Sequence, residues 1–103
     1  MDKIVLGNLF IALAQVLYML LQFAVVLVIV RALASWLNPD PYNPIVRFLN
    51  DTTDPLLRPI RRFIPPLGSI DLSPLILLIV LIFIQSFVAG TLRDVGARLV
   101  AGG

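Results

Sequence analysis

The chain has 103 residues, of which 59% are hydrophobic and 14% are charged, whereas soluble domains carry about 45–50% apolar and about 25% charged residues. A soluble core of this size could not bury so much apolar surface, so we expect the excess to face lipid. The sequence has no His and no Cys, which excludes imidazole bases, thiolate nucleophiles, disulfides, and zinc, iron–sulfur or haem sites built on these ligands. We therefore expect no enzyme, cofactor or metal, and a net charge of +2 is too small to indicate nucleic-acid binding.

Two uncharged runs predict two transmembrane helices. The first run covers residues 4–30 and the second covers residues 72–92. The first would reach roughly 40 Å as a helix, more than the roughly 30 Å hydrocarbon core requires, and it is too long for the apolar region of a secretory signal peptide. We expect membrane-spanning helices over about 4–30 and about 73–95, in a single all-α membrane domain covering residues 1–103.

The segment over about 31–72 holds seven of the eight prolines. An irregular loop inside the hydrocarbon would leave backbone groups without partners, so this segment is expected at the membrane surface. Asn43 can cap a short helix with Pro44 at its first position, and Asp54 can cap a second with Pro55 at its first position. The predicted architecture is a hairpin of two transmembrane helices, joined by a Pro-rich segment with two short amphipathic interfacial helices.

Three groups of residues in and around this segment resemble the centre of the YggT family of membrane proteins. They are Arg31-Ala32-Leu33-Ala34-Ser35-Trp36 with Asn38-Pro39 and Asn43-Pro44; Thr53-Asp54-Pro55-Leu56-Leu57-x-Pro59-Ile60-Arg61; and Pro65 with Ile70-Asp71-x-Ser73-Pro74.

The resemblance implies a member with one such unit, in a bacterial plasma (inner) membrane. Family members have been linked to ion or osmotic-stress tolerance, to cell division and nucleoid or plastid organisation, and to cofactor attachment on a cytochrome complex. The family supplies no agreed active site, so no catalytic residue is carried over to this chain.

A basic face is predicted on the second interfacial helix, where Arg58, Arg61 and Arg62 lie opposite apolar side chains. The apolar residues at helical spacing are Leu56, Ile60, Phe63 and Ile64. Attraction to anionic lipid is worth about 1 kcal/mol for each basic residue near the surface, so we expect lipid contact. A docking face for an acidic protein partner is the alternative.

Charged and aromatic residues at the segment ends have structural interpretations. Arg31 can pair with Asp71 and clamp the two helix ends, or it can simply reach up to the headgroups. Asp54, and Asp71 with Ser73 and Pro74, are typical of helix starts; a cation site would require several acidic residues to converge. Trp36 suits the headgroup region.

Amide side chains recur inside the predicted spans. Asn8, Gln15 and Gln22 follow each other every seven residues, and Gln85, Ser86 and Gly90 lie in the second span. Ser86-x-x-x-Gly90 would let another helix approach closely. We favour helix–helix contact, within the hairpin or between protomers, over a polar lining for ions.

The favoured function is a non-enzymatic scaffold, assembly or organising factor that contacts anionic lipid and protein through its interfacial segment. The alternative is an oligomeric channel or accessory subunit in ion homeostasis and osmotic-stress tolerance. We expect a homo-oligomer or a membrane-protein partner. Five Arg in the central segment against three basic residues in the tails favour a cytoplasmic position for that segment.

Overall fold

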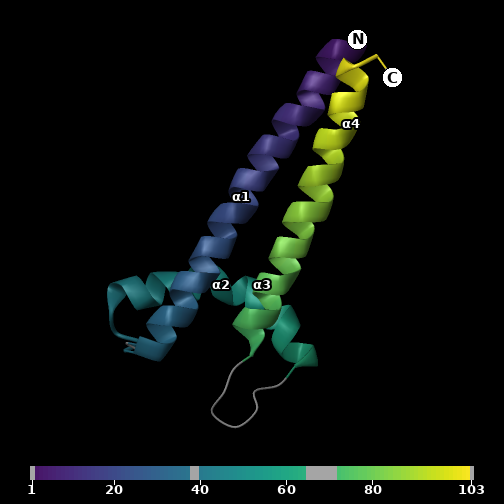
Figure 1. Cartoon of the computed structure of the whole chain (residues 1–103). Coiled ribbons are helices and arrows are strands. Elements are labelled where there is room, and N and C mark those ends of the chain that lie inside the picture. The colour runs from purple at the N-terminus through teal and green to yellow at the C-terminus, as the bar shows by residue number, and fades with distance from the viewer. Residues whose placement is uncertain (1, 38–39, 65–71, 103) are drawn as a thin grey trace. The chain divides into compact units, whose positions relative to one another are not determined.

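The computed structural model describes residues 2–37, 40–64 and 72–102, and in these ranges every regular element is helical. In chain order they are α1 (Lys3–Leu37), α2 (Pro44–Phe63), α3 (Ser73–Ile84), a single π-helical stretch η1 (Gln85–Ala89) and α4 (Gly90–Val100). Figure 1 shows α3, η1 and α4 following one another as one helical run.

Two of these helical runs are long and apolar enough to cross a membrane. They are Lys3–Leu37, with 35 residues, and Ser73–Val100, with 28 residues. At about 1.5 Å per residue the two runs reach roughly 50 Å and roughly 40 Å, so each exceeds the roughly 30 Å hydrocarbon core. Both runs continue beyond the uncharged residues that predicted them: α1 continues past Arg31, and α4 continues past Arg93.

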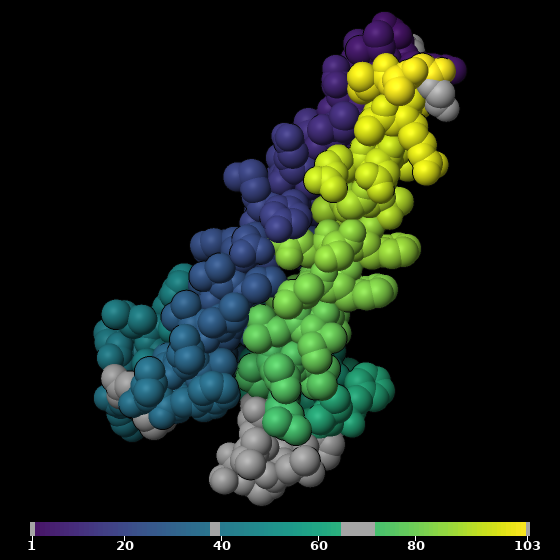
Figure 2. All heavy atoms as spheres, viewed as in Figure 1, coloured from purple at the N-terminus to yellow at the C-terminus, as the bar shows by residue number. Residues whose placement is uncertain are grey.

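The chain divides into two compact units, which are Met1–Phe23 with Leu81–Gly103, and Ala24–Val80. In the first unit, the N-terminal part of α1 lies beside α4, with both chain ends at the same end of the pair (Figure 1). The first and last turns touch in the space-filling view (Figure 2).

Two glycines bring the helices of the first unit together. A Cβ atom added at Gly7 would lie 2.6 Å from the carbonyl oxygen of Gly96, and one added at Gly96 would lie 2.6 Å from the carbonyl oxygen of Gly7. Side chains at these positions would therefore overlap backbone atoms of the other helix. Glycine at both positions lets the two backbones approach closely, as small residues do at contacts between membrane helices.

The second unit combines the C-terminal part of α1, the whole of α2 and the beginning of α3. In Figure 1, α2 runs across the directions of α1 and α3. The buried apolar side chains of this unit come from all three helices, and they are Val25, Val28, Ala32, Val46, Leu49, Leu57 and Leu77.

The prediction of two short interfacial helices is wrong, because α2 is one helix of 20 residues with Pro55 and Pro59 inside it. Each proline removes one backbone hydrogen bond, yet both rings lie on exposed positions. The buried side of α2, formed by Val46, Leu49, Thr53 and Leu57, keeps a spacing of three or four residues across Asp54. Burial of this continuous side holds the helix together where proline alone would end it.

The start of α2 agrees with the sequence. Asn43 caps the helix as predicted, with its Oδ1 accepting a hydrogen bond of 2.9 Å from the N–H of Ile45. Pro44 occupies the first position, where its missing N–H has no intrahelical partner to lose.

Candidate functional site

Arg31 is the centre of a buried polar cluster in the second unit. Its Nη1 donates a hydrogen bond of 2.7 Å to Thr53 Oγ1 and lies 2.7 Å from Asp54 Oδ1. Thr53 Oγ1 in turn donates to the carbonyl oxygen of Leu49 at 2.7 Å. Arg31 is only 9% exposed, and a buried guanidinium requires such partners because desolvation is expensive. The Arg31 cluster (Arg31, Thr53 and Asp54) therefore fixes α2 to α1.

This cluster gives Arg31 a different partner from the one that the sequence suggested. Asp71, the expected partner, lies outside the described residues. Asp54 was predicted to cap a helix, and that prediction is wrong. The buried side of α2 extends past Asp54, so its carboxylate lies in mid-helix and is available to Arg31. Its Oδ1 also lies 3.9 Å from Arg61 Nη1.

Helix α2 carries three different sides. At about 100° per residue, the buried side of Val46, Leu49, Thr53 and Leu57 is flanked on one edge by large exposed apolar side chains. The members of this apolar edge are Ile45, Phe48, Leu56 and Phe63, which are 43–85% exposed.

The remaining side of α2 is basic. Arg47, Arg58 and Arg62 follow each other at intervals of eleven and four residues, so they form one stripe, here called the arginine stripe. All three are exposed, and none forms an ion pair within the described residues. Asp51 lies on the same stripe and offsets one of the three charges.

The arginine stripe differs from the predicted basic face. Arg61 does not belong to it, because its side chain is part-buried beside Asp54, whereas Arg47 does belong. The predicted apolar face also divides: Leu56 and Phe63 are exposed, while Ile60 and Ile64 are part-buried. Arg47 was not predicted to join the basic face, because a helix boundary at Asp54 would place Arg47 and Arg58 on different helices.

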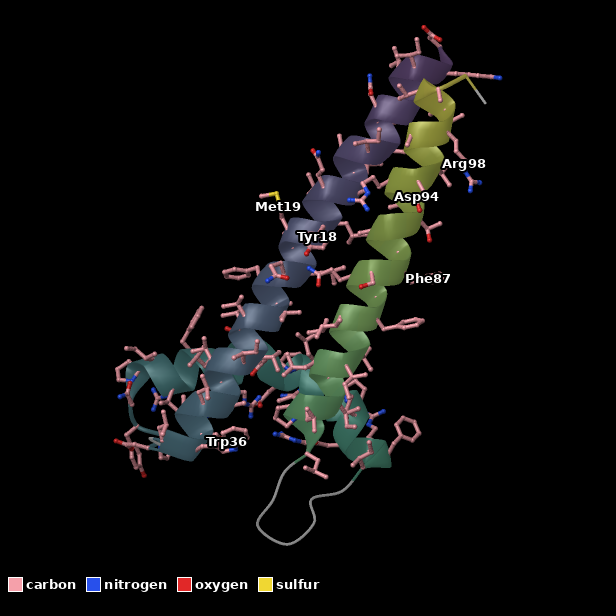
Figure 3. The ribbon with its side chains drawn as sticks, viewed as in Figure 1. Tyr18, Met19, Trp36, Phe87, Asp94 and Arg98 are labelled. Atoms are coloured by element: carbon pink, nitrogen blue, oxygen red, sulfur yellow. The ribbon has the colours of Figure 1, made fainter. Side chains whose placement is uncertain are left out.

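Other motif residues lie near the ends of the helices. Trp36 is 76% exposed and projects from the last turn of α1 (Figure 3). Ser73 begins α3 and is fully buried, with Pro74 next to it in the first turn. Asn38 and Pro39 lie outside the described residues. Within those residues, no group of three or more acidic side chains could hold a metal ion.

Two of the predicted amides meet inside the first unit. Gln85 Nε2 donates to Gln22 Oε1 at 2.8 Å and to the carbonyl oxygen of Tyr18 at 3.3 Å. Tyr18 lies on the side of α1 that faces the second run, whereas Phe87 points away from α1 (Figure 3). Asn8 and Gln15 are exposed, and the structure gives neither of them a side-chain hydrogen bond to a described residue.

Ser86 and Gly90 do not form the close helix contact of the first unit. Ser86 is exposed, and a Cβ atom added at Gly90 would meet nothing within 4 Å. The close approach is made by Gly7 and Gly96 instead, which lie in no motif that predicts helix contact. A contact of Ser86 and Gly90 with another protomer stays a prediction.

The comparison with known proteins agrees with the sequence motifs. A family model described as CCB3/YggT matches residues 10–92. The chain is 43% identical over 74 residues to "Uncharacterized protein YggT" of Escherichia coli K12, which covers 72% of this chain and 39% of that protein. It is 38% identical over 64 residues to an uncharacterised protein of Pseudomonas aeruginosa, covering 62% of this chain and 32% of that protein.

A plant protein also matches. "YlmG homolog protein 2, chloroplastic" of Arabidopsis thaliana is 42% identical over 55 residues, covering 53% of this chain and 22% of that protein. The chain thus aligns with about two fifths or less of the length of these relatives. No solved structure matches the chain.

Proposed function

This chain belongs to the CCB3/YggT family, and from that premise we propose that it is a non-enzymatic membrane scaffold that organises lipid and protein partners through α2. The proposal places Lys3–Leu37 and Ser73–Val100 across a bacterial plasma membrane, with α2 lying on the membrane surface.

The observation that carries the proposal is the arrangement of the three sides of α2. One side is buried in the second unit and bonded to Arg31 of α1. The apolar edge is free to enter the acyl-chain boundary, and the arginine stripe faces away from that edge. An interfacial helix requires this division, because its apolar side lies in the lipid while its basic side meets headgroups and water. The direction of α2 across α1 and α3 (Figure 1) suits a helix that lies in the membrane plane.

The Arg31 cluster supports a fixed scaffold in preference to a loosely tethered loop. Because Arg31 is held by Thr53 and Asp54, α2 cannot rotate about its axis without breaking a buried ion pair. The arginine stripe therefore keeps a constant orientation toward whatever binds it. Anionic headgroups attract each of its cations with about 1 kcal/mol, and an acidic membrane protein could use the same surface.

The charge distribution supports a cytoplasmic position for α2. Arg31, Arg47, Arg58, Arg61 and Arg62 lie in the central segment, while Lys3, Arg93 and Arg98 lie toward the chain ends. Positively charged residues are retained on the cytoplasmic side of bacterial membranes. The segments that carry Lys3, Arg93 and Arg98 would then lie on the opposite side of the membrane.

The test is purification of the full chain from its native membrane in a mild detergent, followed by quantification of bound proteins and lipids. We expect a heteromeric complex whose protein and anionic-lipid content falls in the double variant Arg58→Gln/Arg62→Gln. The matched control, Lys3→Gln/Arg98→Gln, removes the same charge from the chain ends and should keep the complex intact.

The proposal fails if both double variants retain partner and lipid as the unchanged protein does. A pure homo-oligomer that conducts ions in planar bilayers would also contradict it, and would favour the channel or accessory-subunit alternative for ion homeostasis.

A further inference from the structure

A groove lies open on one side of the helix pair in the first unit. It has a volume of about 630 Å³, within the range of roughly 300–1,000 Å³ that is typical of small-molecule sites. The residues that line it come from α1 on one side and from η1 and α4 on the other. They are Ala14, Gln15, Tyr18, Met19, Gln85, Ser86, Ala89, Gly90 and Arg93. We call this hollow the lateral groove.

Small residues keep the lateral groove open. Ala14, Ala89 and Gly90 occupy positions where a larger side chain would fill it, and the space beside Gly90 is free of other atoms to 4 Å. Gln85, Ser86 and Ala89 belong to the π-helical stretch, and such stretches are frequent at functional sites. The close contact at Gly7 and Gly96 holds the pair together in the same unit.

The mainly apolar groove also contains polar side chains, and one of them is held in place. Gln85 is only 6% exposed. Its Nε2 donates hydrogen bonds to the carbonyl oxygen of Tyr18 and to Gln22 Oε1. Gln15 and Ser86 also line the groove. Their side chains form no hydrogen bond within the described residues, so an amide and a hydroxyl donor remain available for a bound molecule.

One end of the groove carries a cation. Arg93 is the first charged residue after the uncharged run 72–92, and it is exposed. Within the described part of the chain it forms no ion pair. The groove therefore begins at a positive charge and continues along two apolar helices. A matching ligand has an anionic head, hydrogen-bond acceptors just behind it and an apolar tail.

We propose that the lateral groove binds one anionic phospholipid. Its phosphate meets Arg93, and its ester oxygens accept hydrogen bonds from Gln15 and Ser86. The glycerol region lies beside Ala14 and Ala89, and one acyl chain continues past Met19. This site is separate from the arginine stripe, which belongs to the other unit and attracts headgroups without enclosing a chain. It relies on the proposed membrane insertion of the helices but not on the scaffold role.

A second copy of the chain fits the groove less well. Two copies related by a two-fold axis along the membrane normal would present the same surface to each other. Their Arg93 side chains would then lie at the same depth, where like charges repel. A phosphate supplies the opposite charge.

The experiment titrates the full-length protein, purified in a neutral detergent, with phosphatidylglycerol or phosphatidylcholine and counts bound lipids by native mass spectrometry. We expect one phosphatidylglycerol site that phosphatidylcholine fills less well. Arg93→Gln should weaken this site by about fivefold, as expected for the loss of one cation near a headgroup. Gly90→Leu should remove it by filling the groove.

Two controls separate this site from other lipid contacts. Arg98→Gln removes a basic residue from the same helix outside the groove, and Arg58→Gln/Arg62→Gln removes two charges from the arginine stripe; both variants should keep the site. If Gly90→Leu does not fold, Arg93→Gln alone tests whether the lateral groove binds the anionic lipid. Equal affinity in Arg93→Gln and the unchanged protein, or equal binding of both lipids, overturns the proposal. A folded Gly90→Leu variant that keeps the lipid also overturns it.

Discussion

At the scale of single residues, the Arg31 cluster shows how the surroundings decide the role of a side chain. Arg31 follows a long uncharged run, and its position alone is typical of a flank that reaches for headgroups. Helix α2 instead provides a hydroxyl and a carboxylate at 2.7 Å. A guanidinium that is 9% exposed then becomes a connection between two helices.

Removing the carboxylate should weaken this connection. We expect Asp54→Asn to lower the free energy of unfolding by about 1–3 kcal/mol, because Arg31 would be left buried without its anion. Chemical unfolding in mixed detergent micelles, followed by circular dichroism, measures this change. The control Asp51→Asn makes the same substitution on the exposed side of α2 and should change stability little. Equal loss in both variants would contradict a specific role for the pair.

The glycines allow a second test at the residue scale. Gly7→Ala places a methyl group 2.6 Å from a backbone oxygen, so the helices must separate. Overpacking of this kind typically costs about 1–3 kcal/mol. Gly90→Ala meets open space and should instead raise helix stability by up to about 1 kcal/mol. Thermal unfolding of both variants in the same detergent compares them, and a Gly7→Ala protein at least as stable as the original would contradict the close contact.

At the scale of the elements, α2 combines packing, an apolar edge and a basic stripe in 20 residues. The packed side fixes the rotation of the helix, and that rotation determines which side chains can meet lipid. Phe48 and Phe63 are 60% and 85% exposed, an arrangement that would be unfavourable in water. Their exposure is understandable if the apolar edge enters the membrane.

Spin labels can test this orientation, because the chain contains no cysteine and each introduced thiol is unique. In liposomes, labels at Phe48→Cys and Phe63→Cys should be relaxed more by oxygen than by a water-soluble nickel complex. Labels at Arg58→Cys and Arg62→Cys should show the opposite preference. The same solvent accessibility at all four positions would mean that α2 does not lie in the interface.

The elements also show where sequence reasoning succeeds and where it stops. The uncharged runs predict the long helices, and Asn43-Pro44 predicts the start of α2, because both signals are local. The continuity of α2 through Pro55 and Pro59 depends on burial against other helices, which proline rules do not include. For the same reason, neither Arg47 in the arginine stripe nor Asp54 as the partner of Arg31 was predicted.

The glycine contact was missed for a different reason. Gly7 and Gly96 lie at opposite ends of the sequence, and a glycine inside an apolar helix gives no indication of which distant residue it meets. The lateral groove is similarly invisible from sequence. The sequence predicts helix contact for four of its lining residues, which are Gln15, Gln85, Ser86 and Gly90. Only the structure brings them together with Arg93 around one groove.

At the scale of the whole molecule, the membrane orientation is the main prediction. Single cysteines at Tyr42→Cys and Ala101→Cys should react differently with a membrane-impermeant maleimide added to intact cells after outer-membrane permeabilisation. Ala101→Cys should be labelled and Tyr42→Cys protected until the plasma membrane is opened, because the central segment carries most of the basic residues. The reverse labelling pattern would place α2 on the outer face.

The Arg31 cluster also has a consequence for the order in which the protein assembles during synthesis. Arg31 and Thr53 are separated by 22 residues, so their contact closes a short loop and can form as soon as α2 has left the ribosome. The contact of Gly7 with Gly96 joins residues that are far apart in the sequence, so it must wait until Gly96 has been synthesised. Helix α2 can thus pack on α1 before the second long helical run is complete, and the contact between the N-terminal part of α1 and α4 forms later.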